Sequence, residues 1–261
     1  MAFTVHAVMP GVWHIVDCMG VCMTLLEGEN AAMLVDTGYG IEDVADFMRH
    51  MTDLPLTVFL THNHHDHAMG ARCFPETYML EADMADWDMF TNDKMRRRVL
   101  TQAIGKNLTV DEKTFLAGKI PLPKVMKPGV IDLGGLTAEI IEAPGHTPGS
   151  AVVYVPERKL LLSGDDWNPC TWLFFPQALG LREYRSNMRG IQQLPFEKVL
   201  CPHREALYDR WMFDDFFNAL TDGNLRAAEP VNIAPYEQID TCQATLPHDQ
   251  VFVFDWAKSG L

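Results

Sequence analysis

The sequence predicts an α/β protein built as a four-layer αββα sandwich, in which two β-sheets pack face to face and helices cover their outer faces. Three observations support this prediction. The chain has two β-rich halves, and each half is followed by a segment with helical spacing. No linker rich in Pro, Ser or Gly divides the halves, and 261 residues suffice for one large core. We therefore expect residues 1–261 to form a single domain.

Short apolar runs broken by turns make up the first part of the chain. Strands are predicted at 5–8, 12–16, 21–26, 31–35 and 56–60, with a further short strand at 77–80. Between the fourth and fifth of these strands, residues 41–51 have helical spacing, and acidic residues in the first turn suit the helix dipole.

Residues 82–128 differ from the β-rich halves and predict a helical insertion, which would form a lid or a pocket wall. Their patterning is helical rather than alternating, and prolines at 121, 123 and 128 end the segment. The basic triplet Arg96-Arg97-Arg98 lies within it. Because the chain as a whole is acidic, we interpret the triplet as a solvated helix face.

The second half repeats the order of strands followed by helices, and this repetition is the basis of the two-sheet prediction. Strands are predicted at 130–133, 136–141, 151–155, 159–162 and 198–200, helices at 182–194 and 205–220, and a last strand at 250–254.

Charge and composition restrict the class of partner. The formal net charge is −14, from 35 acidic and 21 basic residues, which argues against nucleic acid and favours a small-molecule substrate. No run reaches the roughly 18 apolar residues that a membrane helix requires, so no membrane partner is expected. The opening residues lack the pattern of a secretory signal, and we expect a cytoplasmic protein. A homodimer is one possible assembly.

The densest group of metal donors is the run Thr61-His62-Asn63-His64-His65-Asp66-His67, with five strong donors in six residues. It follows the predicted strand 56–60 and so would lie at the carboxyl end of a strand, where α/β sheets place their ligands. Imidazole and carboxylate donors suit zinc, iron or manganese. The alternative is a solvated, His-rich turn that holds no ion.

Three further loops present donors after predicted strands. They are the segment 144–150 with His146, the Gly164-Asp165-Asp166 turn, and Pro202-His203. One His or Asp at the end of a strand is more often an ordinary turn residue than a ligand. Four such loops in one chain indicate a metal site together.

These segments resemble the metallo-β-lactamase superfamily of metallohydrolases. The matching elements occur in the family's order and span residues 31–203: an Asp-Thr-Gly turn at Asp36, His62-x-His64-x-Asp66-His67, Gly145-His146-Thr147-Pro148-Gly149, Gly164-Asp165, and Pro202-His203. The resemblance implies two divalent metal ions, zinc first, with iron or manganese as alternatives. By this resemblance His62, His64 and His146 hold the first ion, Asp66, His67 and His203 hold the second, Asp165 bridges them, and Asp36 orients a ligand histidine.

The chemistry that the resemblance implies is hydrolysis, with Asp66 and Asp165 as catalytic metal ligands. Two ions lower the pKa of a shared water, and the resulting hydroxide would attack an ester, a lactone or a thioester. Two alternatives use the same scaffold: a phosphodiesterase, and an iron-dependent oxidoreductase similar to the persulfide dioxygenases. A third is a binding protein that uses the site only to hold a ligand. After Asp165 no tyrosine stands where lactonases place a general acid, so the subfamily stays open.

Aromatic side chains near these motifs are candidates for the substrate pocket. They are Tyr39, Trp167, Trp172 and Phe174, and packing in a turn or in the core is the alternative for each. His65 stands at a non-ligand position of the motif and is interpreted as a bystander. Asp166 is interpreted as a solvated carboxylate, with a proton shuttle as the alternative.

Overall fold

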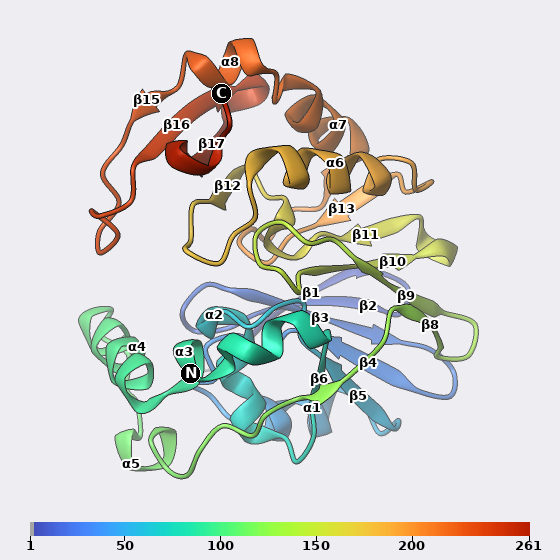
Figure 1. Cartoon of the computed structure of the whole chain (residues 1–261). Coiled ribbons are helices and arrows are strands. Elements are labelled where there is room, and N and C mark those ends of the chain that lie inside the picture. Colours follow the sequence, from blue (N-terminus) through green and yellow to red (C-terminus); the bar gives the residue numbers. More distant parts are fainter. Residues whose placement is uncertain (1–2) are drawn as a thin grey trace.

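The computed structural model describes residues 3–261, and its strands form two large sheets and one smaller sheet (Figure 1). The first sheet has the order β1-β2-β3-β4-β5-β6-β7. These strands are β1 Thr4–Met9, β2 Val12–Val16, β3 Cys22–Glu27, β4 Ala32–Val35, β5 Leu56–Phe59, β6 Tyr78–Met79 and β7 Lys124–Val125. The pairs from β1 to β4 are antiparallel and those from β4 to β7 are parallel, so β4, β5 and β6 end at the same edge.

The second sheet has the order β14-β13-β11-β10-β9-β8. Its strands are β8 Gly129–Asp132, β9 Thr137–Glu142, β10 Ala151–Val155, β11 Leu160–Leu162, β13 Lys198–Leu200 and β14 Tyr208–Asp209. The pair β11 and β13 is parallel and its neighbours are antiparallel. The loops after β11 and β13 therefore leave the sheet at one edge, as the loops after β4 and β5 do in the first sheet.

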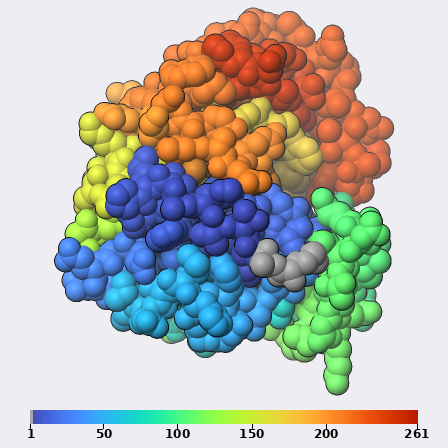
Figure 2. All heavy atoms as spheres, turned by 180° about the vertical axis from the view of Figure 1, so that it is seen from behind, coloured from blue at the N-terminus to red at the C-terminus, as the bar shows by residue number. Residues whose placement is uncertain are grey.

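The two large sheets bury an apolar core between them. Met33, Val35 and Phe59 of the first sheet pack in one cluster with Val153 and Leu162 of the second, and all five are buried. Each fully buried side chain of this size contributes roughly 1.5–3 kcal/mol. Figure 2 shows from behind how the blue N-terminal half and the orange C-terminal half lie against each other.

Helices cover both outer faces. The helix α1 (Val44–Met51) begins after Asp43, whose side chain accepts a hydrogen bond from the backbone N–H of Asp46, and it packs on the first sheet. The helices α6 (Leu181–Ile191) and α7 (Arg210–Ala219) pack on the second sheet. In α6 the buried residues recur at helical spacing: Leu181, Tyr184, Met188 and Ile191. The predicted αββα sandwich is confirmed.

The smaller third sheet was not predicted. Its order is β12-β17-β16-β15, formed by β12 Cys170–Leu173, β17 Gln250–Asp255, β16 Thr241–Leu246 and β15 Glu229–Pro230. The expected last strand is β17, but its parallel partner β12 lies far away in the sequence. Such pairing leaves no local sequence pattern. The helix α8 (Asp222–Arg226) precedes this sheet.

The predicted helix 205–220 is too long at its start. Residues 208–209 form β14, because Tyr208 pairs with Val199 of β13, and the helix begins at Arg210. Helical spacing does not detect a two-residue strand that precedes a helix. The structure thus replaces the first turn of that helix with an edge strand.

The segment 82–128 contains short helices and one edge strand. These helices are α3 Trp87–Thr91, α4 Asp93–Gly105 and α5 Glu112–Phe115, and they follow the 3-10 turn η2 Glu81–Asp86. The green residues of this segment lie along one side of the molecule (Figure 2). No helix among residues 3–261 combines the length and the apolar character needed to cross a bilayer.

The basic triplet does not form a uniform solvated face, and the interpretation is wrong for Arg96. The Arg96 side chain is 1% exposed, and its guanidinium donates to the backbone carbonyls of Phe115 and Gly118. It satisfies carbonyl groups at the end of α5. Arg97 is exposed and lies 3.7 Å from the Glu112 carboxylate, whereas Arg98 lines a cavity.

Candidate metal centre

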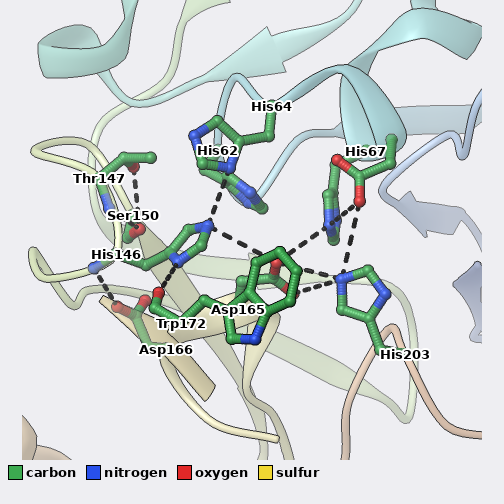
Figure 3. A network of polar contacts seen from close by, with 12 residues as sticks. His62, His64, His67, His146, Thr147, Ser150, Asp165, Asp166, Trp172 and His203 are labelled. Atoms are coloured by element: carbon green, nitrogen blue, oxygen red, sulfur yellow. Dashed lines mark hydrogen bonds and ion pairs between the residues drawn. The ribbon is translucent and has the colours of Figure 1, made fainter. Parts of the chain in front are cut away.

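Four loops at one edge of the sandwich bring the predicted ligands together (Figure 3). The loop after β5 carries His62 and His64, and the short helix α2 (His65–Ala68) carries Asp66 and His67. His146 follows β9, Asp165 lies in the turn after β11, and His203 follows β13. Because each donor stands just beyond a strand of a rigid sheet, the positions of the donors are fixed by the sheets.

The donors form three overlapping groups, in each of which the ligand atoms lie within 4.8 Å of one another. The groups are His62, His64 and His146; His62, His67 and Asp165; and Asp66, His67 and His203. Asp165 lies between the outer two groups, since its Oδ2 is 3.5 Å from His146 Nε2 and 3.5 Å from His67 Nε2. His203 Nε2 is 3.1 Å from the same carboxylate and 3.7 Å from Asp66 Oδ2.

The chemistry of these donors fits metal ions. The Nε2 atoms of His62 and His67 are buried, and neither has a hydrogen-bond partner in the part of the chain that the structure describes. An unsatisfied buried polar atom costs about 1–3 kcal/mol. A cation bound between these two nitrogen atoms and the neighbouring carboxylate would remove that cost. All-His and Asp ligation of this kind suits first-row divalent ions.

Asp36 supports two ligand histidines from behind. It lies just after β4, is 2% exposed and accepts a hydrogen bond from His67 Nδ1 at 3.0 Å. The hydroxyl of Thr61 donates to Asp36 Oδ2 at 2.9 Å and lies 3.0 Å from His62 Nδ1. A protonated Nδ1 on each ring leaves the Nε2 lone pair free for a metal, so Asp36 fixes the tautomer of His67 directly and that of His62 through Thr61.

His146 and His64 are held by different partners. His146 Nδ1 donates to the backbone carbonyl of Trp172 at 2.7 Å, which turns Nε2 towards the centre. His64 presents Nδ1, which is 2.8 Å from His146 Nε2, while its Nε2 lies 2.6 Å from the side-chain amide of Gln177. The atom of Gln177 placed there is the amide nitrogen, while its amide oxygen is buried without a partner in the described residues. If Nδ1 of His64 gives its lone pair to a metal, Nε2 carries the proton, and the Gln177 amide turned by 180° would accept it through its oxygen.

The pKa shifts of the donors describe the electrostatic potential of the centre. Burial lowers the pKa of His62, His64 and His146, which keeps these imidazoles neutral at physiological pH. Burial alone would raise the pKa of Asp66, but His67 and His65 hold it at about 2. Burial also opposes a proton on His67, yet the carboxylates of Asp165 and Asp66 raise its pKa. The centre therefore has a negative potential that attracts cations.

Comparison with known proteins agrees with this geometry. The family profile described as Metallo-beta-lactamase superfamily matches residues 16–203. The chain belongs to this superfamily. An acyl-coenzyme A thioesterase, MBLAC2, of Gallus gallus is 26% identical over 202 residues, which are 69% of this chain and 70% of that protein.

Solved structures share the fold. A metallo-beta-lactamase from Pontibacter korlensis superposes with a TM-score of 0.59 at 18% identity, covering 83% of this chain and 98% of that one. A structure of TTHA1623 in a di-iron-bound form superposes with a TM-score of 0.54 at 21% identity, covering 76% of this chain and 94% of that one. At identities this low, the two structures bear on the fold alone.

Asp83 is a site residue that sequence reasoning missed. Located in η2, it is 1% exposed, and its Oδ2 accepts from the backbone N–H of Asn63 at 3.1 Å and from Thr147 Oγ1 at 2.7 Å. Its Oδ1 accepts from the backbone N–H of Gly149 at 2.6 Å. One carboxylate of the insertion thus joins the two loops that carry His62, His64 and His146 in this superfamily member. No local motif marks it.

A cavity of about 440 Å³ opens in front of the donors. Ligand histidines and both predicted catalytic carboxylates, Asp66 and Asp165, form its floor. Aromatic and polar side chains form its walls: Tyr39, Phe90, Trp172, Phe175 and Tyr236, with His65, Arg98, Gln102, Asn168 and Arg204. A volume of this size suits a small organic ligand.

The predicted pocket residues divide into two pairs. Tyr39 and Trp172 line the cavity, but Trp167 and Phe174 do not, and their assignment to the pocket is wrong. Trp167 is fully buried against Tyr208 and Phe213 in the core behind the site. Phe174 is equally buried and packs against Tyr236, whereas its neighbour Phe175 reaches the cavity.

The interpretation of Asp166 changes. Asp166 is not solvated: it is fully buried, its Oδ1 accepts from the backbone N–H of His146 at 3.0 Å, and burial raises its pKa well above the usual range. It therefore holds the His146 loop in place. His65 lines the cavity with its ring edge-on to Tyr39, at a centroid distance of 5.6 Å.

Proposed function

We propose that this chain is a metal-dependent hydrolase that cleaves an ester, a lactone or a thioester, with acyl thioesters as the first class to test. The observation that carries the proposal is the complete set of seven convergent donors, five of which form the floor of a cavity of about 440 Å³. The curated relative MBLAC2, an acyl-coenzyme A thioesterase, supports the choice of thioesters.

The donors divide into two sets that would hold two divalent ions, most simply zinc, with iron or manganese as alternatives. His62, His64 and His146 form one set, Asp66, His67 and His203 form the other, and Asp165 lies between them. When bound, such a pair lowers the pKa of a water molecule and polarises the substrate oxygen. Asp66 and Asp165 would balance the positive charge of the ions.

The walls of the cavity would bind and orient the acyl group. Phe90, Trp172 and Phe175 offer apolar surface next to His64 and His146, and Phe175 packs against both of these rings. Burial raises the pKa of Tyr39, so its hydroxyl keeps its proton and could donate it in a hydrogen bond to a substrate or leaving-group oxygen. Apolar walls also exclude water from the acyl chain.

The test is hydrolysis by metal-loaded protein, followed by metal analysis. Protein loaded with zinc, manganese or iron should cleave an ester, a lactone or a thioester in a panel that also contains phosphodiesters. The variant His64→Gln should lose both metal and activity, by more than the 10- to 100-fold typical of outer-shell changes. His50→Gln is the matched control, because His50 is an exposed histidine of α1 far from the cavity.

Two results would overturn the proposal. One is a metal-loaded protein that cleaves none of these substrates. The other is a protein that binds one iron and consumes oxygen in the presence of a persulfide, which would indicate the oxidoreductase alternative. Cleavage of phosphodiesters alone would replace the acyl substrate with a phosphoryl one.

A further inference from the structure

The cavity contains a cation that the proposed reaction does not use. Arg98 lies on α4 next to Arg96 and Arg97, but its environment differs from theirs. The guanidinium of Arg96 donates its hydrogen bonds to backbone carbonyls, and Arg97 pairs with Glu112. The Arg98 side chain, in contrast, lines the cavity. Arg96 is therefore a structural residue, Arg97 is a surface residue, and Arg98 is a cavity residue.

Arg98 has no ion-pair partner among residues 3–261, although the chain carries a net charge of −14. Some arginines of this acidic protein do pair, such as Arg49 with Asp46 and Arg185 with Asp222. Arg204, the other arginine that lines the cavity, also has no ion pair among residues 3–261, but its guanidinium donates to the backbone carbonyl of His203. Because carboxylates outnumber cations, an unpaired guanidinium at a cavity wall is available for an anionic ligand.

Neutral hydrogen-bonding groups surround this guanidinium. Gln102 lies one helical turn after Arg98 on the same face of α4 and lines the same cavity. Tyr236, from the loop before β16, faces α4 across the opening, and in Figure 1 this loop descends towards α4. Burial raises the pKa of the Tyr236 hydroxyl, and the nearby Arg98 opposes that rise, so the two side chains are close.

Arg98 makes no direct polar contact with the metal donors. Its charge acts to lower the pKa of Tyr39 and of His65, but no ion pair or hydrogen bond joins it to any of the seven donors within residues 3–261. A guanidinium, an amide and a hydroxyl offer several hydrogen-bond donors in one place. A carboxylate or a phosphate has the matching acceptors, whereas the alkyl part of a neutral acyl group has none.

We propose that Arg98, together with Gln102 and Tyr236, forms an anion-binding subsite that selects substrates with a carboxylate or phosphate remote from the bond that is cleaved. The inference rests on the proposed function only for the identity of that bond. Charge-assisted hydrogen bonds to a guanidinium are about twice as strong as neutral ones, and the loss of one of them corresponds to roughly a ten- to hundredfold preference.

Three thioesters distinguish the two sources of the anion. Hexanoyl-N-acetylcysteamine is neutral, adipoyl-N-acetylcysteamine carries a carboxylate on the acyl side, and hexanoyl-coenzyme A carries phosphates on the thiol side. The ratio of kcat/KM for an anionic thioester to that for the neutral one should fall ten- to hundredfold in Arg98→Gln. Arg97→Gln, the adjacent exposed arginine, should keep the wild-type ratio. The arm that responds identifies the carboxylate or the phosphate.

Binding of uncleavable thioether analogues of the three compounds, measured by calorimetry at low and high salt, gives a second readout. The charged analogue should bind more weakly in Arg98→Gln and at high salt, because salt screens the interaction. If wild-type protein cleaves no thioester but Arg98→Gln still weakens the charged analogue, the proposed reaction fails and the subsite stands. If cleavage proceeds and both variants keep the wild-type ratio, the subsite fails and the reaction stands.

Discussion

The carboxylate of Asp83 provides a sensitive test of the described site, because it is buried and still accepts three hydrogen bonds. Burial raises its pKa from 3.8 to about 6. The folded protein therefore holds the proton of Asp83 more tightly than the unfolded chain does. The stability that this proton contributes is complete below about pH 4 and is lost as the pH rises through 6.

The expected magnitude follows from the two pKa values. The full loss is about 3 kcal/mol, at 1.36 kcal/mol for each pKa unit between 3.8 and 6. Between roughly pH 5 and pH 7.5 the linkage relation gives a loss of about 1.4 kcal/mol. The substitution Asp83→Asn removes the titration and keeps the shape. The free energy of unfolding of the wild type should thus fall by about 1.4 kcal/mol relative to the variant over this range.

Urea unfolding of chelator-treated protein at the two pH values measures this difference. Subtracting the free energy of unfolding of the variant from that of the wild type at each pH cancels the titration of the groups that the two proteins share. Asp88→Asn, the same substitution at an exposed position of the adjacent helix α3, is the control. A constant difference between wild type and Asp83→Asn would refute the reasoning, because the carboxyl would then titrate equally in both states.

Three other substitutions test the supports of the site and the core behind it. Asp36→Asn should weaken metal binding about 10- to 100-fold, since an amide is a poorer acceptor for the His67 Nδ1 proton. Competition with a chelator measures the metal affinity, and an unchanged affinity would contradict this role of Asp36. Gln177→Leu removes the acceptor for His64 Nε2 and should weaken metal binding about tenfold in the same assay; wild-type affinity would mean that the ring needs no such partner. Trp167→Ala should destabilise the fold by about 3–5 kcal/mol in urea unfolding, and a loss below about 1 kcal/mol would contradict its place in the core.

Local patterns were sufficient to predict most strands and the loops that carry the seven donors. An apolar run such as 56–60 predicts a strand before its partner strands are known. A polar cluster directly after that strand then lies at the edge of the sheet. Donor type and spacing then indicate a metal site, because few other arrangements place four histidines and a carboxylate in six residues. This information is contained in short segments of the chain.

The residues that hold and surround the donors could not be predicted in this way. Asp83 meets Asn63 and Gly149, and Gln177 meets His64, through contacts between segments 20 to 113 residues apart. The three arginines of α4 have identical chemistry, and only the packing of α5 and of the loop around Tyr236 gives each a different environment.

The aromatic residues after Asp165 show the same division. The sequence by itself determined that an aromatic cluster follows the metal loop, and that the chemistry of the site is that of histidine and aspartate donors. Only the tertiary structure decided that Trp172 faces the cavity and Trp167 the core, because β12 takes its orientation from the parallel strand β17, which joins it from the far end of the chain. Burial is a property of the whole fold, whereas donor chemistry belongs to each residue.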